Sequence, residues 1–367
     1  MRILYCRGYE ESTWTFMTVY PGYEEGEPWA YQDDPDVFLV SVNEYNLDQD
    51  LVDKIIQLHG RPDAILNPFY CRIDLDTSVP VYTATNFWYH AAVLLLGATA
   101  PTQQITTQCF NFMLNRKRIN RYLTARLVSY FELLPYSEYT WSGADRNYDL
   151  SIIIDEMNRL DLPWVDPVRQ HVLPSIEIEP RWFGTKGKLT SSGIATSLPA
   201  NPYYQDWNQG LDEMFSTSAV SIITESIDYQ AGAAFTEKTA YAILGRTIPI
   251  WVGGKYQAEE FAKLGFDTFN DVVDHSYQYC DTLVERCYRA FADNLHLLNN
   301  LTHATYVRQQ MHNRLLKNQQ HLIDSCSSIE NIIAESQKGI ANFDPKVQKL
   351  MLTLIQKGVK RTRRWRL

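Results

Sequence analysis

The sequence of 367 residues lacks several features that mark whole classes of protein. No apolar run approaches the roughly 18 residues of a membrane-spanning helix. The first residues are typical of a strand rather than of the apolar region of a secretion signal. Internal repeats and low-complexity linkers are missing. With 45% hydrophobic and 21% charged residues, the composition is that of a globular chain rather than a disordered or fibrous one.

Cysteine is scarce as well. None of the six cysteines belongs to a Cys-x-x-Cys pair, the spacing on which zinc ribbons and thioredoxin-like sites depend. Because no secretion signal is evident, we expect reduced thiols and a cytoplasmic location.

Short apolar strands alternate with helical stretches along the first hundred residues. This strand-helix-strand order indicates a parallel sheet with crossover helices. The same order returns after residue 106. The patterns predict strands over 2–6, 37–42, 64–66, 79–85, 108–114, 138–142, 219–224 and 248–252, and helices over 51–58, 87–96, 122–134 and 237–244.

The chain is therefore predicted to be α/β, with three parts. Residues 1–105 and 106–282 are each predicted to form a doubly wound domain. Residues 283–367 form a helical extension, because 283–338 contain no proline and show only helical patterns. Residues 143–215 are rich in proline, glycine and aromatic residues, and we expect loops with short helices there.

The sharpest local signal lies at the start of the helix predicted over 237–244. Thr236 is a suitable N-cap, and Glu237 occupies the first turn, where acidic residues are favoured. Lys238 opposes the helix dipole unless an anion such as a phosphate also binds there. The two oxygens of Glu237 can accept both hydroxyls of a ribose. An ordinary capped helix with solvated charges is the alternative.

Two further groups of polar residues follow strands. The strand over 219–224 ends in Glu225 and Ser226, and ligands of open α/β sheets bind at such strand ends; capping of a loop is the alternative. Residues 115–126 carry five basic side chains and no acidic one, and arginine suits bidentate phosphate contacts. The candidate phosphate ligands in that stretch are Asn115, Arg116, Arg118 and Arg121.

Together these segments resemble the donor domain of fucosyltransferase-type glycosyltransferases, of the bacterial and bacteriophage kind. The resemblance covers roughly 108–127 and 218–278 and is carried by the Asn-Arg-basic helix, the strand ending in Glu-Ser, and the Thr-Glu-Lys block with its later Pro-Ile strand. It implies a GT-B fold, in which two Rossmann-like domains face each other across a cleft. The acceptor would then bind to 1–105 and the nucleotide-diphosphate sugar to 106–282, with the last helices crossing back to the first domain.

The resemblance also implies roles for single residues. Glu237 would bind the ribose of the donor, and Lys238 and Arg116 would neutralise its diphosphate as charge develops there. Such enzymes need no metal and hold no permanent cofactor. An inverting transferase also needs a base for the acceptor hydroxyl, expected at a strand end of the first domain; a retaining enzyme would need none. The candidate bases are Glu10, Glu11, Glu44 and His90.

The net charge of −9 is unevenly distributed. Residues 1–100 hold fifteen acidic and five basic residues, whereas 345–367 hold eight basic residues and no acidic one. The basic tail could contact the acidic first domain, an anionic membrane or nucleic-acid phosphates.

We therefore predict a metal-independent hexosyl- or pentosyltransferase that acts on a hydroxyl acceptor. The acceptor alternatives include a membrane-surface glycan and a hydroxymethylated pyrimidine of bacteriophage DNA, the second of which would place the enzyme in a host cytoplasm. A non-catalytic binding protein on a decayed transferase fold is the alternative from another functional class.

Overall fold

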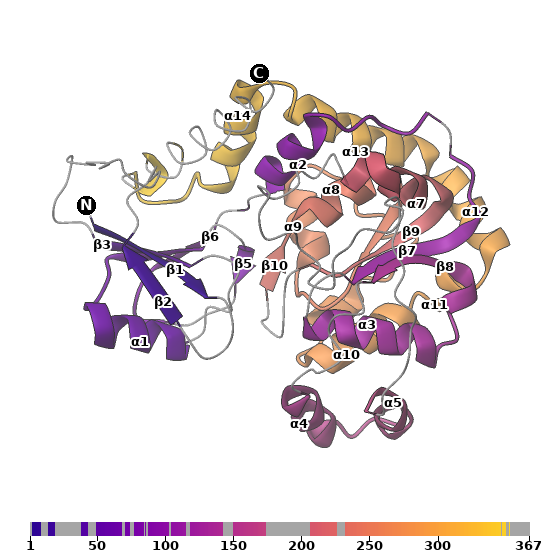
Figure 1. Cartoon of the computed structure of the whole chain (residues 1–367), viewed down its shortest axis with the longest axis horizontal. Coiled ribbons are helices and arrows are strands. Elements are labelled where there is room, and N and C mark those ends of the chain that lie inside the picture. The colour runs from indigo at the N-terminus through magenta and orange to yellow at the C-terminus, as the bar shows by residue number, and fades with distance from the viewer. Residues whose placement is uncertain are drawn as a thin grey trace.

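The computed structural model contains two large sheets of mostly parallel strands, with helices packed around them (Figure 1). The mixed α/β class expected from the sequence is therefore correct. Within the part of the chain that the structure describes, no helix combines the length and the apolar character needed to cross a membrane. The described residues are 2–8, 14–18, 38–42, 49–67, 70–73, 77–83, 85, 87–102, 104–114, 118–141, 150–173, 206–225, 232–345, 347–349 and 352.

The first sheet has five strands in the order β2-β1-β3-β4-β6. From β1 to β6 the neighbouring strands run parallel, whereas the edge strand β2 pairs antiparallel with β1. Helix α1 (Gln49–His59) connects β3 to β4 and buries Leu51 and Ile55. The strands are β1 (Arg2–Gly8), β2 (Trp14–Thr18), β3 (Phe38–Val42), β4 (Ala64–Asn67) and β6 (Val81–Thr83). All were predicted except β2.

The second sheet has four strands, all parallel, in the order β11-β9-β7-β8. Its central strands are buried on both faces, which explains their near-continuous apolar sequences. The predicted strands and the helix α8 (Glu237–Leu244) are confirmed within one or two residues at each end. The strands are β7 (Gln108–Leu114), β8 (Ser137–Trp141), β9 (Ser218–Ile223) and β11 (Ile248–Trp251).

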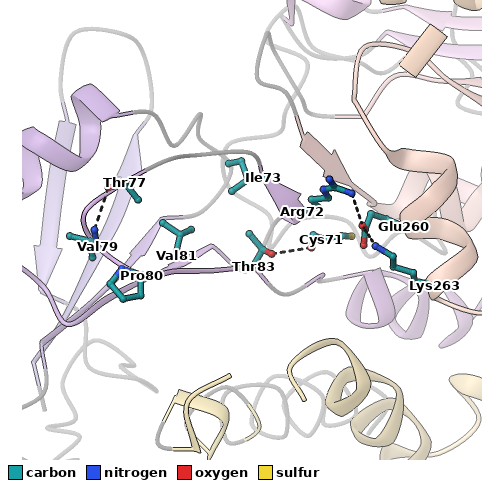
Figure 2. Close-up of a pocket in the computed structure, with 10 residues that line it drawn as sticks. All are labelled: Cys71, Arg72, Ile73, Thr77, Val79, Pro80, Val81, Thr83, Glu260 and Lys263. Carbon is teal, nitrogen blue, oxygen red and sulfur yellow. Dashed lines mark hydrogen bonds and ion pairs between the residues drawn. The ribbon is translucent and has the colours of Figure 1, made fainter. Parts of the chain in front are cut away.

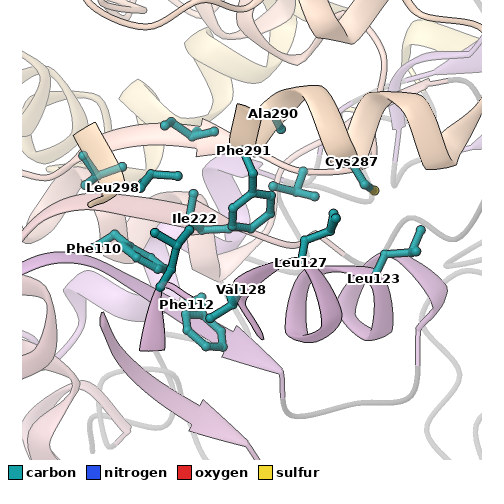
Figure 3. Close-up of a cluster of buried hydrophobic side chains, with 14 of the residues drawn as sticks. Phe110, Phe112, Leu123, Leu127, Val128, Ile222, Cys287, Ala290, Phe291 and Leu298 are labelled. Atoms are coloured by element: carbon teal, nitrogen blue, oxygen red, sulfur yellow. The ribbon is translucent and has the colours of Figure 1, made fainter. Parts of the chain in front are cut away.

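Hydrophobic layers cover the two faces of this sheet. Successive residues of one strand point to opposite faces, so Ile222 belongs to one layer and Ile223 to the other. Figure 3 shows the first layer, in which Phe291 and Leu127 lie close to Ile222. Its helices include α3 (Ile119–Tyr130), α4 (Ser151–Arg159), α5 (Val165–Val172), α10 (Leu283–Ala292), α11 (Leu295–Leu298) and α12 (Leu301–Gln310).

The second layer contains α8 and several segments from distant parts of the sequence. The buried Trp207 and Phe215 pack there with Tyr241 of α8. Helix α2 also packs in this layer, although it precedes residue 105. Its other helices are α2 (Phe87–Leu95), the π-helical turn Trp207–Leu211, α7 (Asp212–Thr217), α9 (Gln257–Lys263), α13 (His312–Ser325) and α14 (Ile329–Gly339).

A small sheet joins the two parts of the molecule. Strand β5 (Tyr70–Ile73) lies in the sequence between β4 and β6 of the first sheet. It pairs antiparallel with β10 (Gly232–Ala234), which directly precedes α8. In Figure 1 this pair lies between the two large sheets. After α14 the chain returns to the first sheet, because the Phe343 ring lies 4.8 Å from the Tyr82 ring of β6.

Candidate functional site

The carboxyl ends of β7, β9 and β11 meet at one edge of the second sheet, where α3 begins. Asn120, in the first turn of α3, ties two of these strand ends together, because its side-chain amide donates to the carbonyls of Glu225 (3.0 Å) and Val252 (3.2 Å). Gly253 follows β11 with a φ of +110°, and a Cβ there would lie 2.9 Å from the Cβ of Asn120. Glycine is thus required at this close approach.

Glu225 is fully buried at the end of β9 and anchors the start of α8. Its carboxylate accepts hydrogen bonds from the backbone N–H of Thr236 (2.9 Å), from the hydroxyl of Thr239 (2.7 Å) and from the hydroxyl of Thr236. Burial raises the pKa of Glu225, although the positive charge of Lys238 opposes that rise. The carboxylate therefore positions the helix N-terminus rather than facing solvent.

The first turn of α8 carries a partly exposed ion pair. Thr236 caps the helix as predicted, since its side chain accepts from the backbone N–H of Lys238. The Lys238 ammonium lies 2.7 Å from a carboxylate oxygen of Glu237 and 3.3 Å from the Thr236 hydroxyl. The Glu237 side chain is 21% exposed and that of Lys238 is 11% exposed.

Several influences set the pKa of Glu237. Burial opposes its ionisation, but the charges of Lys238 and His90 outweigh that effect and hold the pKa well below its usual value. Glu237 therefore stays ionised at neutral pH. His90 lies half-buried on α2.

The basic residues at the start of α3 have a different environment. Arg121 is 1% exposed, and its guanidinium donates twice to the carbonyl of Thr224 (both 3.3 Å). Arg126 is also buried and donates to the carbonyls of Val172 and His171. Arg118, the residue before the helix, is half-buried at the same edge of the sheet. Of these three, Arg118 is the one nearest to solvent.

The remaining candidates lie outside the described residues. These are Glu10, Glu11, Glu44, Asn115, Arg116 and Ser226. Most of the basic tail, 353–367, falls in the same class.

Sequence reasoning missed one titratable group near α8. Asp206 directly precedes the turn Trp207–Leu211 and is exposed. The pKa of Asp206 is raised to about 6. The larger cause is partial desolvation of the carboxylate by the surrounding protein, and the smaller is the negative charge of Glu237. Asp206 lies in 143–215, where the sequence shows no periodic pattern from which it could have been found.

A cavity of about 420 Å³ lies where β5 and β6 face α9, and Figure 2 shows side chains from both sides of it. Arg72 of β5 pairs with Glu259 of α9 at 3.2 Å, and Lys263 pairs with Glu260 at 2.7 Å. We call this space the seam cavity. Its lining residues are Cys71, Arg72, Ile73, Thr77, Val79, Pro80, Val81, Thr83, Glu260 and Lys263.

The described residues bring together no group of three or more side chains of the kinds that ligate metals. Comparison with protein-family models and with curated proteins gives no match for this chain. The first turn of α8 and its surroundings are therefore the candidate functional site.

Proposed function

We propose that the protein is a glycosyltransferase of GT-B architecture that binds a nucleotide-diphosphate sugar at the first turn of α8. The observation that supports this best is the partly exposed Glu237–Lys238 pair, held at the carboxyl edge of a parallel sheet by the buried Glu225. Ligands of open α/β sheets bind at that edge. An ion pair at a helix N-terminus offers both an acceptor for sugar hydroxyls and a donor for phosphate oxygens.

The geometry suggests a division of labour between the two side chains. The Glu237 carboxylate, which stays ionised, accepts the two hydroxyls of the donor's ribose. The Lys238 ammonium has three N–H donors, of which two face Glu237 and Thr236. The third is available for an oxygen of the diphosphate leaving group, where a fixed positive charge lowers the barrier as negative charge grows. Arg116 and Arg118 would supplement that charge.

The arrangement of the two sheets supports the GT-B proposal. The seam cavity is lined from both sides, by β5 and β6 and by α9. The return of the chain to β6 at Phe343 adds a contact of the kind expected for a last helix that crosses back. We infer that the acceptor approaches from the side of the first sheet.

The five described cysteines are all free, as in proteins of the reducing cytoplasm, where we place the reaction.

Donor binding tests the proposal directly. Wild type is screened by thermal shift against UDP-, GDP-, ADP-, CMP- and dTDP-linked sugars, since a ligand of the folded state raises the melting temperature. Calorimetry then compares Glu237→Gln and Lys238→Met, with Lys338→Met on the exposed face of α14 as control. We expect the first two changes to weaken binding by about tenfold or more, the loss of one charge-assisted hydrogen bond. Unchanged affinity, or no binding to wild type, overturns the proposal.

A DNA acceptor is the second candidate, favoured by the eight basic residues of 345–367. Gel-shift titration of duplex DNA with the full chain and with a chain lacking 353–367 tests it. Salt-sensitive binding that disappears with the tail supports a nucleic-acid acceptor. Donor hydrolysis without any acceptor separates an enzyme from a binding protein on a decayed fold.

A further inference from the structure

Three segments of the second layer run side by side in the same direction. Helix α8 starts at the carboxyl edge of the sheet, where Thr236 binds Glu225. It ends at the opposite edge, where Arg308 donates to the carbonyls of both Gly245 and Phe215. The segment 206–217 therefore reaches that edge together with α8. Closer to the carboxyl edge, the Trp207 ring stacks on the Tyr241 ring, with 5.8 Å between their centroids.

Helix α2 and the chain that follows it take the same course. The Phe87 ring lies 6.0 Å from the Phe235 ring, just before the start of α8. Further along, the Thr99 carbonyl accepts from the indole N–H of Trp207 (3.0 Å), and the Pro101 carbonyl accepts from Arg246 (2.6 Å). The three segments are thus aligned from one edge of the sheet to the other (Figure 1).

This alignment brings Asp206, Glu237 and His90 to similar positions near the carboxyl edge of the sheet. Tyr241 lies one helical turn after Glu237, on the same face of α8. Because Trp207 stacks on Tyr241, the chain at Asp206, one residue before Trp207, lies near the level of the first turn. His90, one turn after Phe87, approaches that turn from α2. Electrostatic interactions of Glu237 with both His90 and Asp206 agree with this placement. The charged group that acts on Asp206 is Glu237 of α8, which in turn interacts with Lys238 of α8 and His90 of α2.

We propose that Asp206 is the general base that accepts the proton of the acceptor hydroxyl. The assignment rests on the proposed function, because it requires a sugar donor at Glu237 and Lys238. Asp206 suits the role because it is exposed and can meet a substrate, whereas Glu225 is buried and accepts hydrogen bonds from Thr236 and Thr239. The base would then come from the second layer rather than from a strand end of the first sheet.

The reaction balances as a single displacement. Asp206 takes the proton of the acceptor hydroxyl while that oxygen forms a bond to the anomeric carbon of the sugar. The bond from that carbon to the diphosphate oxygen breaks, and its electron pair leaves with the nucleoside diphosphate, whose added charge Lys238 offsets. Water can replace the acceptor, which gives donor hydrolysis by the same step.

The carboxyl groups of Glu237 and Asp206 differ in pKa, and acid-base catalysis depends on such differences. Glu237 is held ionised, whereas the pKa of Asp206 is raised to about 6. A base whose pKa lies near the working pH is both deprotonated and strong enough to take a proton.

The test is the pH dependence of donor hydrolysis, with the sugar nucleotide found in the thermal-shift screen. We expect Asp206→Asn to lower kcat by about a hundredfold or more, with donor affinity unchanged. In wild type kcat/KM should fall about tenfold per pH unit below pH 6, and this limb should vanish in the variant. Glu213→Gln, at an exposed position of α7, is the matched control.

The outcomes separate the two proposals. Donor binding with an unaltered rate or pH profile in Asp206→Asn overturns the assignment of the base and leaves the transferase proposal intact. A wild-type protein that binds a donor but neither hydrolyses nor transfers its sugar overturns it too, because there is then no reaction for the carboxylate to serve. Absence of donor binding in wild type is instead the failure of the proposed function.

Discussion

The start of α3 and the first turn of α8 lie at the same edge of the second sheet, and both are rich in charge. In α3 two basic side chains point inward: Arg121 and Arg126 are buried and donate to backbone carbonyls. At α8 the pair Glu237–Lys238 remains partly exposed. The comparison teaches that charged side chains near a helix N-terminus can be buried to serve the fold, as in α3, or left partly exposed, as at α8, where we propose that a ligand binds.

The inward use of arginine has a simple physical basis. Strand ends and turns leave carbonyl groups without partners, and a buried carbonyl without a hydrogen bond is costly. A guanidinium carries five N–H donors in a planar fork and can satisfy several carbonyls at once. Arg308 and Arg286 do the same elsewhere in this domain, each with at least three carbonyl partners.

The largest effect is expected where the two regions are joined, at Glu225. Replacement by Ala would leave two hydroxyls and one backbone N–H without their acceptor in a buried site, at about 1–3 kcal/mol each. We expect the free energy of unfolding to fall by about 3–5 kcal/mol, measured by urea denaturation followed by tryptophan fluorescence. Donor binding should weaken in parallel, because the start of α8 loses its anchor.

Glu225→Gln is the control for that change, because it keeps one acceptor oxygen and nearly the same volume. It should lose markedly less stability than Glu225→Ala. Equal stability of the Ala variant and wild type would contradict the anchoring role and bring back Glu225 as a ligand-facing residue.

A smaller effect is expected from the two arginines of the α3 start. Arg121→Met should lower the free energy of unfolding by about 2–3 kcal/mol, because the buried Thr224 carbonyl loses its donors. Arg118→Met, at a half-buried position, should change stability by less than about 0.5 kcal/mol and instead weaken the binding of the sugar nucleotide. Thermal and urea denaturation measure the first quantity and calorimetry the second. A larger loss of stability in Arg118→Met than in Arg121→Met would contradict the distinction between a buried and a half-buried arginine.

Much of the fold could be predicted from the sequence, because its parallel strands are apolar runs separated by helical periodicity. The strand 108–114 and the helix 237–244 were predicted with the observed bounds. The edge strand β2 and the β5–β10 pair were not predicted. They lie outside any strand-helix-strand unit, and their pairing is set by distant parts of the chain.

The candidate site was only partly accessible from the sequence. Capping by Thr236 follows from local rules, and the structure confirms it. The inward direction of Arg121 and the approach of Asp206 and His90 to α8 depend on packing between segments that are distant in the sequence. No local pattern encodes such contacts.

The smallest and sharpest expected effect is a difference in sign between the two glutamates. The folded-state pKa of Glu237 is depressed below its ordinary value of 4.5, so its stabilising contribution is complete above about pH 4.5 and is lost as pH falls towards the folded pKa. The folded-state pKa of Glu225 is raised, so ionisation costs more in the folded protein, and wild type loses stability relative to Glu225→Gln as pH rises above 4.5. Urea denaturation of wild type, Glu225→Gln and Glu237→Gln between about pH 3 and 8 should give stability differences with opposite slopes. Slopes of the same sign would show that both carboxylates have similar environments, and the distinction between a buried anchor and a partly exposed ion pair would be lost.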